Sequence, residues 1–253
     1  MQDNTEPSHR SMEGVTTSEE SIKEILYGTL LGDGYIFGND RYTKRFGFFQ
    51  SEEKKEYVEY LAKLLETRFK KINILKKNAK ERWNAKIQYG FQIGDKYFNH
   101  LQKVFYKRKR KRVTQKILSS LTPLSLALWW MDDGSLTLVN RKYKDRIRAG
   151  NGGRRLTLCT HSFNLKEHKI IQKYFIDRWN IHWIIKKDCG CYCLYSGINE
   201  GIKFLEIIFP YIIPCMFYKI YLNYSDKNSR SPHKARHDKI MKIWSELYGD
   251  IQS

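Results

Sequence analysis

Two apolar segments that both end in Asp-Gly carry the most suggestive chemistry in this sequence. Residues 26–34 read LYGTLLGDG and residues 126–134 read LALWWMDDG, which places Asp33 and Asp133 100 residues apart. Both segments have the character of apolar helices. A carboxylate at the C-terminal end of a helix faces the negative end of the helix dipole, at a cost of about 0.3–1 kcal/mol. A divalent cation held by both carboxylates would supply the missing positive charge.

The same dipeptide also has an ordinary explanation. Asp-Gly is common in turns, and glycine often takes the left-handed conformation that closes a helix, so we expect that conformation at Gly34 and Gly134. A single copy would therefore carry little weight. Two copies, each ending an apolar helix and each followed by the alternating pattern of a strand, favour a metal centre built where two helices end.

The elements that would position these helices occur twice in the same order. The first copy is expected to contain a helix at 21–33, strands at 35–38 and 45–50, a helix at 54–70, strands at 72–77 and 86–93, and a helix at 96–106. The second is expected to contain a helix at 123–133, strands at 135–138 and 156–161, a helix at 165–179, strands at 182–187 and 191–197, and a helix at 200–209. The sequence therefore predicts an α+β fold of two pseudo-symmetric αββαββα halves.

These two copies define the expected domain organisation. Residues 1–20 lack hydrophobic periodicity and are expected to form a flexible leader. The first half is expected to span residues 21–112 and the second half residues 113–221. Residues 222–253 are expected to form a basic tail of unassigned role, with one helix near 237–248.

The charge of the chain points to nucleic acid as its partner. The 46 Lys and Arg residues outnumber the 27 Asp and Glu residues and give a formal net charge of +19, which attracts polyanions. The longest apolar stretches, such as 124–131, are far too short to span a membrane. An odd count of five cysteines and the lack of a secretory start favour a reducing, intracellular location. The C-x-C-x-C run at 189–193 lacks the C-x2-C pairs of structural zinc, so ordinary thiols are favoured there.

With its two motif segments, the chain from Ser21 to about Tyr224 resembles the LAGLIDADG homing endonucleases in their single-chain, two-motif form. The resemblance implies a monomer in which the motif helices pack side by side between the halves, below a β-sheet saddle that binds double-stranded DNA. It implies that Asp33 and Asp133 share two or three Mg²⁺ ions, with Mn²⁺ as a substitute, and that the carbonyls of Gly32 and Asp132 are further metal ligands.

The two motif helices match this pattern unequally. Gly28 and Gly32 lie one turn apart and would let a partner helix approach closely. In the second helix, Leu128 and Asp132 stand where small residues are usual. The adjacent Trp129 and Trp130 are expected to belong to the core.

Further matched positions imply further site residues. The segment 111–114, KRVT, resembles the basic-x-apolar-Pro segment of the family, and PCMFYK at 214–219 resembles its counterpart in the second half. Carried over, Lys111 and Lys219 would stabilise charge that develops on the phosphate. Gln50-Ser51 and His161-Ser162 would position solvent. Two alternatives stay open: Lys111 lies in a six-residue basic run that could simply follow the DNA backbone, and His161 could be an ordinary strand histidine.

The function implied is site-specific cleavage of both strands of a long, pseudo-palindromic DNA target by an intron-encoded enzyme. Its host would be an organelle, mitochondrion or chloroplast, or a low-GC bacterium. The alternatives are an RNA-splicing maturase, whose partner would be intron RNA, and a non-catalytic DNA-binding regulator of the same fold. Strand and loop side chains would read bases in the major groove, and for each a solvated surface charge is an equal alternative. The candidates are Asn39, Arg41, Arg45, Lys76, Arg82, Lys86, Gln88, Gln92, Arg141, Lys142, Arg148, Arg154, Lys186 and Lys187.

Overall fold

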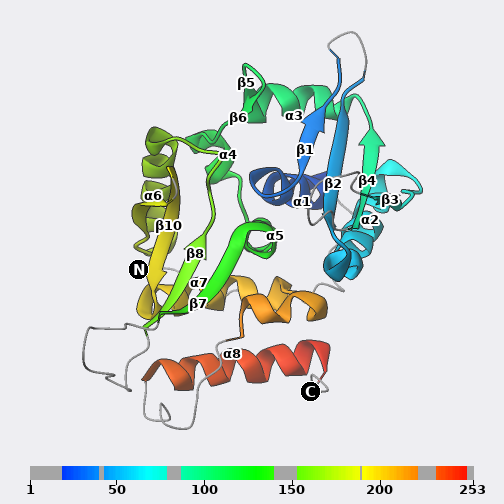
Figure 1. Ribbon diagram of the computed structural model, residues 1–253. Helices are drawn as coiled ribbons and strands as arrows, with labels where there is room; N and C mark the ends of the chain where they lie inside the picture. The colour runs from blue at the N-terminus through cyan, green and yellow to red at the C-terminus, as the bar shows by residue number, and fades with distance from the viewer. Residues whose placement is uncertain are drawn as a thin grey trace, which may run out of the picture.

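A computed structural model of the chain describes residues 19–39, 43–78, 87–139, 153–188, 190–221 and 232–249. Two four-stranded antiparallel sheets lie on either side of a central pair of helices, α1 and α5 (Figure 1). The strand order is β1-β2-β4-β3 in one sheet and β7-β8-β10-β9 in the other. The two orders are equivalent, strand for strand, so the fold confirms the predicted internal repeat.

The helices and strands follow one another in the predicted order. The first half contains α1 (Glu19–Leu31), β1 (Tyr35–Phe37), β2 (Arg45–Ser51), α2 (Lys55–Phe69), β3 (Leu75–Lys77), β4 (Gln88–Gly94) and α3 (Tyr97–Phe105). The second half contains α5 (Pro123–Asp133), β7 (Gly134–Val139), β8 (Gly153–Leu158), α6 (Leu165–Trp179), β9 (Ile184–Asp188), β10 (Cys191–Gly197) and α7 (Ile198–Ile208). The α+β, αββαββα architecture is thereby confirmed.

Several elements differ from the prediction, either because they were not expected or because they are longer than expected. They are the hairpin of β5 (Tyr106–Lys107) and β6 (Arg110–Lys111), the short helix α4 (Gln115–Ser119), the 3-10 helices η2 (Glu52–Lys54), η3 (Phe209–Tyr211) and η4 (Pro214–Lys219), and an α8 (Pro232–Tyr248) longer than expected. The two residues of the hairpin turn, Arg108 and Lys109, have φ angles of 49° and 64°, a left-handed conformation that side chains disfavour.

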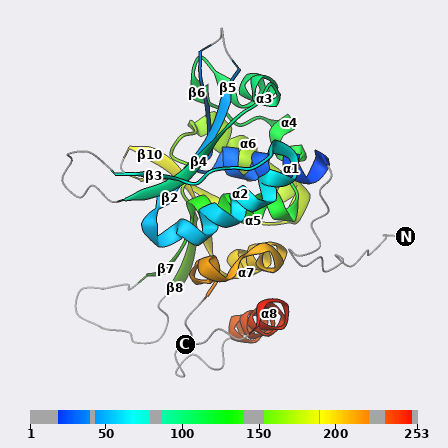
Figure 2. The same ribbon diagram turned by 90° about the vertical axis from the view of Figure 1, so that its right-hand side faces the viewer.

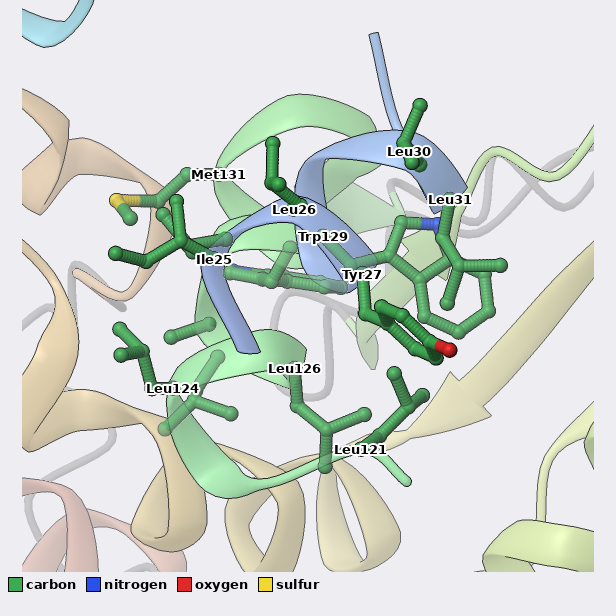
Figure 3. Packing of buried hydrophobic residues seen from close by; sticks show 14 of the residues in the cluster. Ile25, Leu26, Tyr27, Leu30, Leu31, Leu121, Leu124, Leu126, Trp129 and Met131 are labelled. Atoms are coloured by element: carbon green, nitrogen blue, oxygen red, sulfur yellow. The ribbon is translucent and has the colours of Figure 1, made fainter. Parts of the chain in front are cut away.

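The pairing of α1 with α5 depends on two missing side chains. A Cβ atom on Gly28 would lie 2.5 Å from the carbonyl oxygen of Ser125, and one on Gly32 would lie 2.4 Å from the Asp132 carboxylate. The Ser125 hydroxyl donates to the Glu24 carbonyl at 2.8 Å. Apolar side chains fill the space around the two helices (Figure 3). The predicted close approach at Gly28 and Gly32 is therefore confirmed.

The glycines that end the motif segments act differently from the prediction. Gly134 caps α5 with φ −76° and ψ 146°, an extended conformation, and Gly34 likewise has no left-handed φ. Their lack of a side chain is needed for space, because a Cβ on Gly134 would lie 2.1 Å from the Trp130 indole and one on Gly34 would lie 2.8 Å from the Phe46 ring. The prediction of a left-handed closure was wrong at both positions.

The helix α8 is packed against the body of the second half. It lies beside α7 (Figure 1), and its Ile240 and Trp244 side chains are buried. The Trp244 indole donates to the Ile212 carbonyl at 2.9 Å. Arg236 forms an ion pair with Glu206 on α7. The described part of the expected basic tail is thus a structural helix that adds to the core.

The helices α2 and α6 pack against one face of their sheets, and the opposite faces look outward on the same side of the molecule (Figure 2). None of the described helices is both long and apolar enough to cross a membrane.

Candidate active site

The C-terminal ends of α1 and α5 bring three carboxyl groups together. Asp33 follows the end of α1, whereas Asp132 and Asp133 are the last two residues of α5. The backbone N–H of Asp33 donates to Oδ2 of Asp132 at 3.1 Å. The centre is therefore built across the interface between the halves, where the motif pair predicted it.

The Asp132 side chain ties the two halves together at this point. Its side chain is buried, and its Oδ1 accepts a hydrogen bond from the Tyr57 hydroxyl at 3.0 Å. Burial, followed by the neighbouring charges of Asp33 and Asp133, raises the pKa of Asp132 well above its ordinary value. With both oxygens engaged, this carboxyl group is a positioning group, a role that the sequence interpretation did not assign to it.

The negative charge of Asp133 is also disfavoured at this centre. Burial and then the charge of Asp33 raise its pKa to about 7, although Lys111 and Lys219 act in the opposite direction. The Trp129 indole donates to its Oδ2 at 3.3 Å. Trp129 belongs to the core, as predicted, and in addition it fixes the orientation of this carboxylate.

Both lysines implied by the family resemblance reach the centre. Lys111 donates to the Gly32 carbonyl at 2.6 Å, and Lys219 donates to the Gly134 carbonyl at 2.6 Å. Burial lowers the pKa of Lys111. Burial and then Lys54 lower the pKa of Lys219 to about 8. The two ammonium groups therefore lie beside the carboxylates from opposite halves of the chain.

Gln50 also belongs to this centre. Its amide donates to Oδ2 of Asp33 at 2.7 Å, and its Oε1 accepts from Lys54 at 3.3 Å. The family resemblance singled out Gln50 but not Lys54. Lys54 lies in the charged run at 52–56, and nothing in the sequence distinguishes it from its charged neighbours.

The predicted equivalence of Gln50 with His161 is off by one residue. Tyr35 pairs with Gly47 and Ser135 with Thr157, so counting onward along β2 and β8 makes Thr160 the counterpart of Gln50. The Thr160 hydroxyl lies 2.7 Å from His168 Nε2. His161 is the counterpart of Ser51, and its Nε2 lies 2.9 Å from the Cys193 sulfur.

The oxygen ligands at this centre suit a hard divalent cation that completes its coordination shell with water or phosphate oxygens. Within the described residues, no three or more His, Cys, Asp or Glu side chains are arranged to hold a metal by themselves. Asp33 and Asp133 supply two carboxylates, and Mg²⁺ commonly binds one or two carboxylates together with water and phosphate oxygens. The Gly32 carbonyl, an implied ligand, is occupied by the Lys111 ammonium. Cys159, Cys191, Cys193 and Cys215, the cysteines outside position 189, form no disulfide bond.

The six-residue basic run is divided by the hairpin. Arg110 forms a two-pronged ion pair with Glu167 at 2.8 and 3.1 Å, and Arg112 donates to the carbonyls of Lys103 and Val104. Together with Lys111, these residues are engaged by the protein. The side chains of residues 107–109 are exposed. The structure thus separates Lys111, which reaches the site, from the half of the run that is open to a ligand.

Strand register decides which candidate base-reading side chains face outward. In the first sheet, Arg45, Gln88 and Gln92 lie on the face opposite the buried Phe46, Phe48 and Phe91. Lys76 instead pairs with Tyr89, whose ring also receives Lys55 from α2, so Lys76 lies on the helix-covered face. Its neighbour Lys77 lies over the Phe49 ring on the open face. The candidate Lys76 is therefore corrected to Lys77.

The second sheet needs the same correction. Lys186 pairs with Cys193 and approaches the Tyr195 ring on the open face, whereas Lys187 pairs with Tyr192, which contacts His168 of α6. Arg155, not predicted, stacks on Tyr195 with its carbon Cζ 4.6 Å from the ring centre. Asn39 follows β1. The remaining candidates lie outside the described residues, Arg154 by its side chain only: Arg41, Arg82, Lys86, Arg141, Lys142, Arg148 and Arg154.

The repeated halves, the paired helices and the shared acidic centre define a two-motif α+β class of protein. The sequence model of the LAGLIDADG DNA endonuclease family matches residues 23–204. The chain belongs to this family.

Several known proteins are similar to this chain. A protein of Wickerhamomyces canadensis named "Probable intron-encoded endonuclease 1" is 28% identical to this chain, and the match covers 82% of this chain and 87% of that protein. The protein named RecA of Mycolicibacterium flavescens is 24% identical over 83% of this chain, and the chain spans about half the length (48%) of that relative. The homing endonuclease I-WcaI, solved with its DNA recognition sequence, superposes with a TM-score of 0.67 at 23% identity, over 88% of this chain and 96% of that one.

Proposed function

We propose that this protein is a Mg²⁺-dependent homing endonuclease that cuts both strands of a long, pseudo-palindromic DNA target and is encoded within an intron. The observation that carries the proposal is the pairing of Asp33 and Asp133 at the ends of α1 and α5, where burial and mutual repulsion raise the pKa of Asp133 to about 7. Two carboxylates held so close are stabilised by a bound cation.

Each residue of the centre has a role in this proposal. Asp33 and Asp133 would hold the divalent ions, which when bound supply an activated water and neutralise the leaving oxygen. Gln50 holds Asp33 in place and can orient solvent. Lys111 and Lys219 would stabilise the charge that develops on the phosphate. Tyr57 and Trp129 hold the carboxyl groups of Asp132 and Asp133 in fixed orientations.

The open faces of the two sheets are the proposed DNA-binding surface. They lie on the same side of the molecule (Figure 2), and a net charge of +19 favours a polyanion. Strand side chains at the depth of a major groove can distinguish all four base pairs. Arg45, Lys77, Gln92, Arg155 and Lys186 are the proposed base-reading candidates. The single chain supplies both halves of the saddle, which supports a monomer.

The test is incubation of the protein with a randomised double-stranded DNA library and Mg²⁺, followed by sequencing of the cut ends. We expect one long motif with paired cuts on the two strands. Asp33→Asn and Asp133→Asn should abolish double-strand cleavage and leave DNA affinity largely unchanged. Binding by the unaltered protein without cleavage in Mg²⁺ or Mn²⁺ would favour a non-catalytic regulator instead.

A maturase is the second candidate. The cytochrome b mRNA maturase bI2 of Debaryomyces hansenii is 28% identical to this chain over 215 residues and is covered to 74% of its length. Intron RNA would then be a second partner, and an organelle or a low-GC bacterium would be the host. A splicing assay with the host intron tests this candidate separately, because splicing should persist in Asp133→Asn.

A further inference from the structure

The hairpin that follows α3 presents two cationic residues in a backbone conformation that does not suit them. Its two-residue turn, Arg108 and Lys109, has positive φ at both positions, as in a type I′ turn, where Asn-Gly is the favoured sequence. Left-handed backbone is disfavoured at residues other than glycine or asparagine, and such residues cluster at binding and active sites. Both side chains are exposed.

The rest of the hairpin is held firmly. The Tyr106 hydroxyl accepts from the N–H of Ile36 at 3.0 Å. Arg110 reaches the second half through Glu167, and Lys111 reaches the Gly32 carbonyl. These contacts come from both halves of the molecule, so the turn is carried on a fixed support and its charges are presented at a defined position.

A groove of about 740 Å³ lies between this turn, α3 and the end of β1. Four basic residues contribute to its lining, namely Lys44, Lys103, Arg108 and Lys109, and none of the described residues that line it is acidic. The Lys44 side chain is 5% exposed and donates to the Gly38 carbonyl at 2.9 Å. A buried lysine beside three exposed cations makes the groove suited to an anion.

The groove adjoins the surface already proposed for DNA. Phe37, which lines it, pairs with Arg45, and Arg45 lies on the open face of the first sheet. The hairpin lies beside α3 near the end of β1 (Figure 1). In the second half, the equivalent helix α7 leads into η3 instead of a hairpin. Any ligand of the groove is therefore bound on one side of the pseudo-symmetric molecule only.

The geometry points to this groove as a one-sided phosphate-binding site that holds the duplex DNA backbone beside the outer end of the first half-site. The inference rests on the proposed function for the DNA duplex, but it adds an asymmetric contact that the two-fold repeat does not supply. Two or more phosphates would be neutralised there by Arg108 and Lys109, with Lys103 and Lys44 in the wall behind them.

The test replaces the turn by its favoured sequence, in the double variant Arg108→Asn/Lys109→Gly. This change removes two charges and also relieves the backbone, so its melting temperature should be unchanged or higher. The matched control is Lys166→Gln/Lys169→Gln, which removes two exposed charges from α6, on the helix-covered side of the second sheet. All three proteins are compared without metal, so that no cleavage occurs.

Binding of a long duplex is measured as a function of salt. The turn variant should lose about tenfold in affinity and should lower the slope of log affinity against log salt by about 1.8, the amount for two phosphate contacts. The control should keep the slope of the unaltered protein. An equal slope in the turn variant and the unaltered protein would overturn the inference.

Methylphosphonate substitution then locates the contact. Neutralising single phosphates on the first half-site of the cleavage target should lower the affinity of the unaltered protein at certain positions. At the same positions it should not affect the affinity of the turn variant. An identical interference pattern for both proteins, or weakened binding of an RNA hairpin with unchanged duplex affinity, would overturn the assignment. If only this inference is wrong, the unaltered protein still cleaves DNA in Mg²⁺ but the turn variant binds like it. If the proposed function is wrong, the unaltered protein does not cleave DNA, although the turn variant can still bind more weakly.

Discussion

Asp133→Asn should make the metal-free protein more stable at neutral pH, although it destroys the proposed centre. Asp133 has a pKa of about 7 in the folded chain against an ordinary value of 3.8. The unfolded chain therefore releases this proton first as the pH rises, and folding stability falls between about pH 4 and pH 7. Three pKa units correspond to roughly 4 kcal/mol. This is an upper limit for the gain, because Lys111 and Lys219 lose a negative neighbour when asparagine replaces Asp133.

The assay is chemical and thermal unfolding of the two proteins in a chelator, from pH 4 to pH 8. The two should be equally stable near pH 4, and the variant should be more stable by about 1–4 kcal/mol at pH 8, a shift of several degrees in melting temperature. Added Mg²⁺ should stabilise the unaltered protein and affect the variant less. Asp177→Asn removes an exposed carboxylate paired with Lys173 on α6, away from the centre, and serves as the control. A variant that is less stable at pH 8, or a difference that does not vary with pH, would refute the electrostatic argument.

Three further outcomes follow from the geometry. Lys219→Met should slow cleavage of pre-bound complexes, started by adding Mg²⁺, by on the order of a hundredfold with little change in affinity; normal cutting with poor binding would place Lys219 on the backbone-contacting surface instead. Gly28→Ala should lower the free energy of unfolding by about 1–3 kcal/mol in a denaturant titration, because its Cβ would lie 2.5 Å from the Ser125 carbonyl. Lys77→Gln should change the base preference of the cleaved library, whereas Lys76→Gln should not, and the opposite result would contradict the strand register given above.

Hydrophobic periodicity was sufficient to predict the order of the repeated helices and strands, and the repeated Asp-Gly ending of two apolar helices pointed to a centre at Asp33 and Asp133. The helix at 165–179 and the strand at 191–197 were predicted with the bounds that the structure has. Both are bounded by strong signals: Asn164 and Glu167 form a capping box at the start of α6, and β10 follows Gly190 and ends at Gly197. The fold was accessible because these signals are local.

The errors concern positions where side-chain type does not fix the side of a strand. Lys76 and Lys77 are both exposed, as are Lys186 and Lys187. The alternation of residue types therefore does not show which lysine lies on the open face of the sheet, and only the pairing with the neighbouring strand does. The β5–β6 hairpin was missed because Arg108 and Lys109 carry no turn signal. The roles of Tyr57 and the Asp132 side chain depend on contacts across 75 residues of chain, which no local pattern contains.

The contact between Gly32 and Asp132 constrains how such a chain can evolve. If a two-motif protein arises by duplication of one half, both positions begin as the same residue, and two glycines would leave a void where Asp132 now reaches the N–H of Asp33. An aspartate at both positions would be too large, because a Cβ on Gly32 already falls 2.4 Å from the carboxylate. The residues at positions 32 and 132 should therefore covary among proteins that descend from the duplication, so that a large side chain at one position is matched by a small one at the other. A chimaera that joins two copies of residues 21–112 would lose this complementarity, so the halves have become specialised to each other.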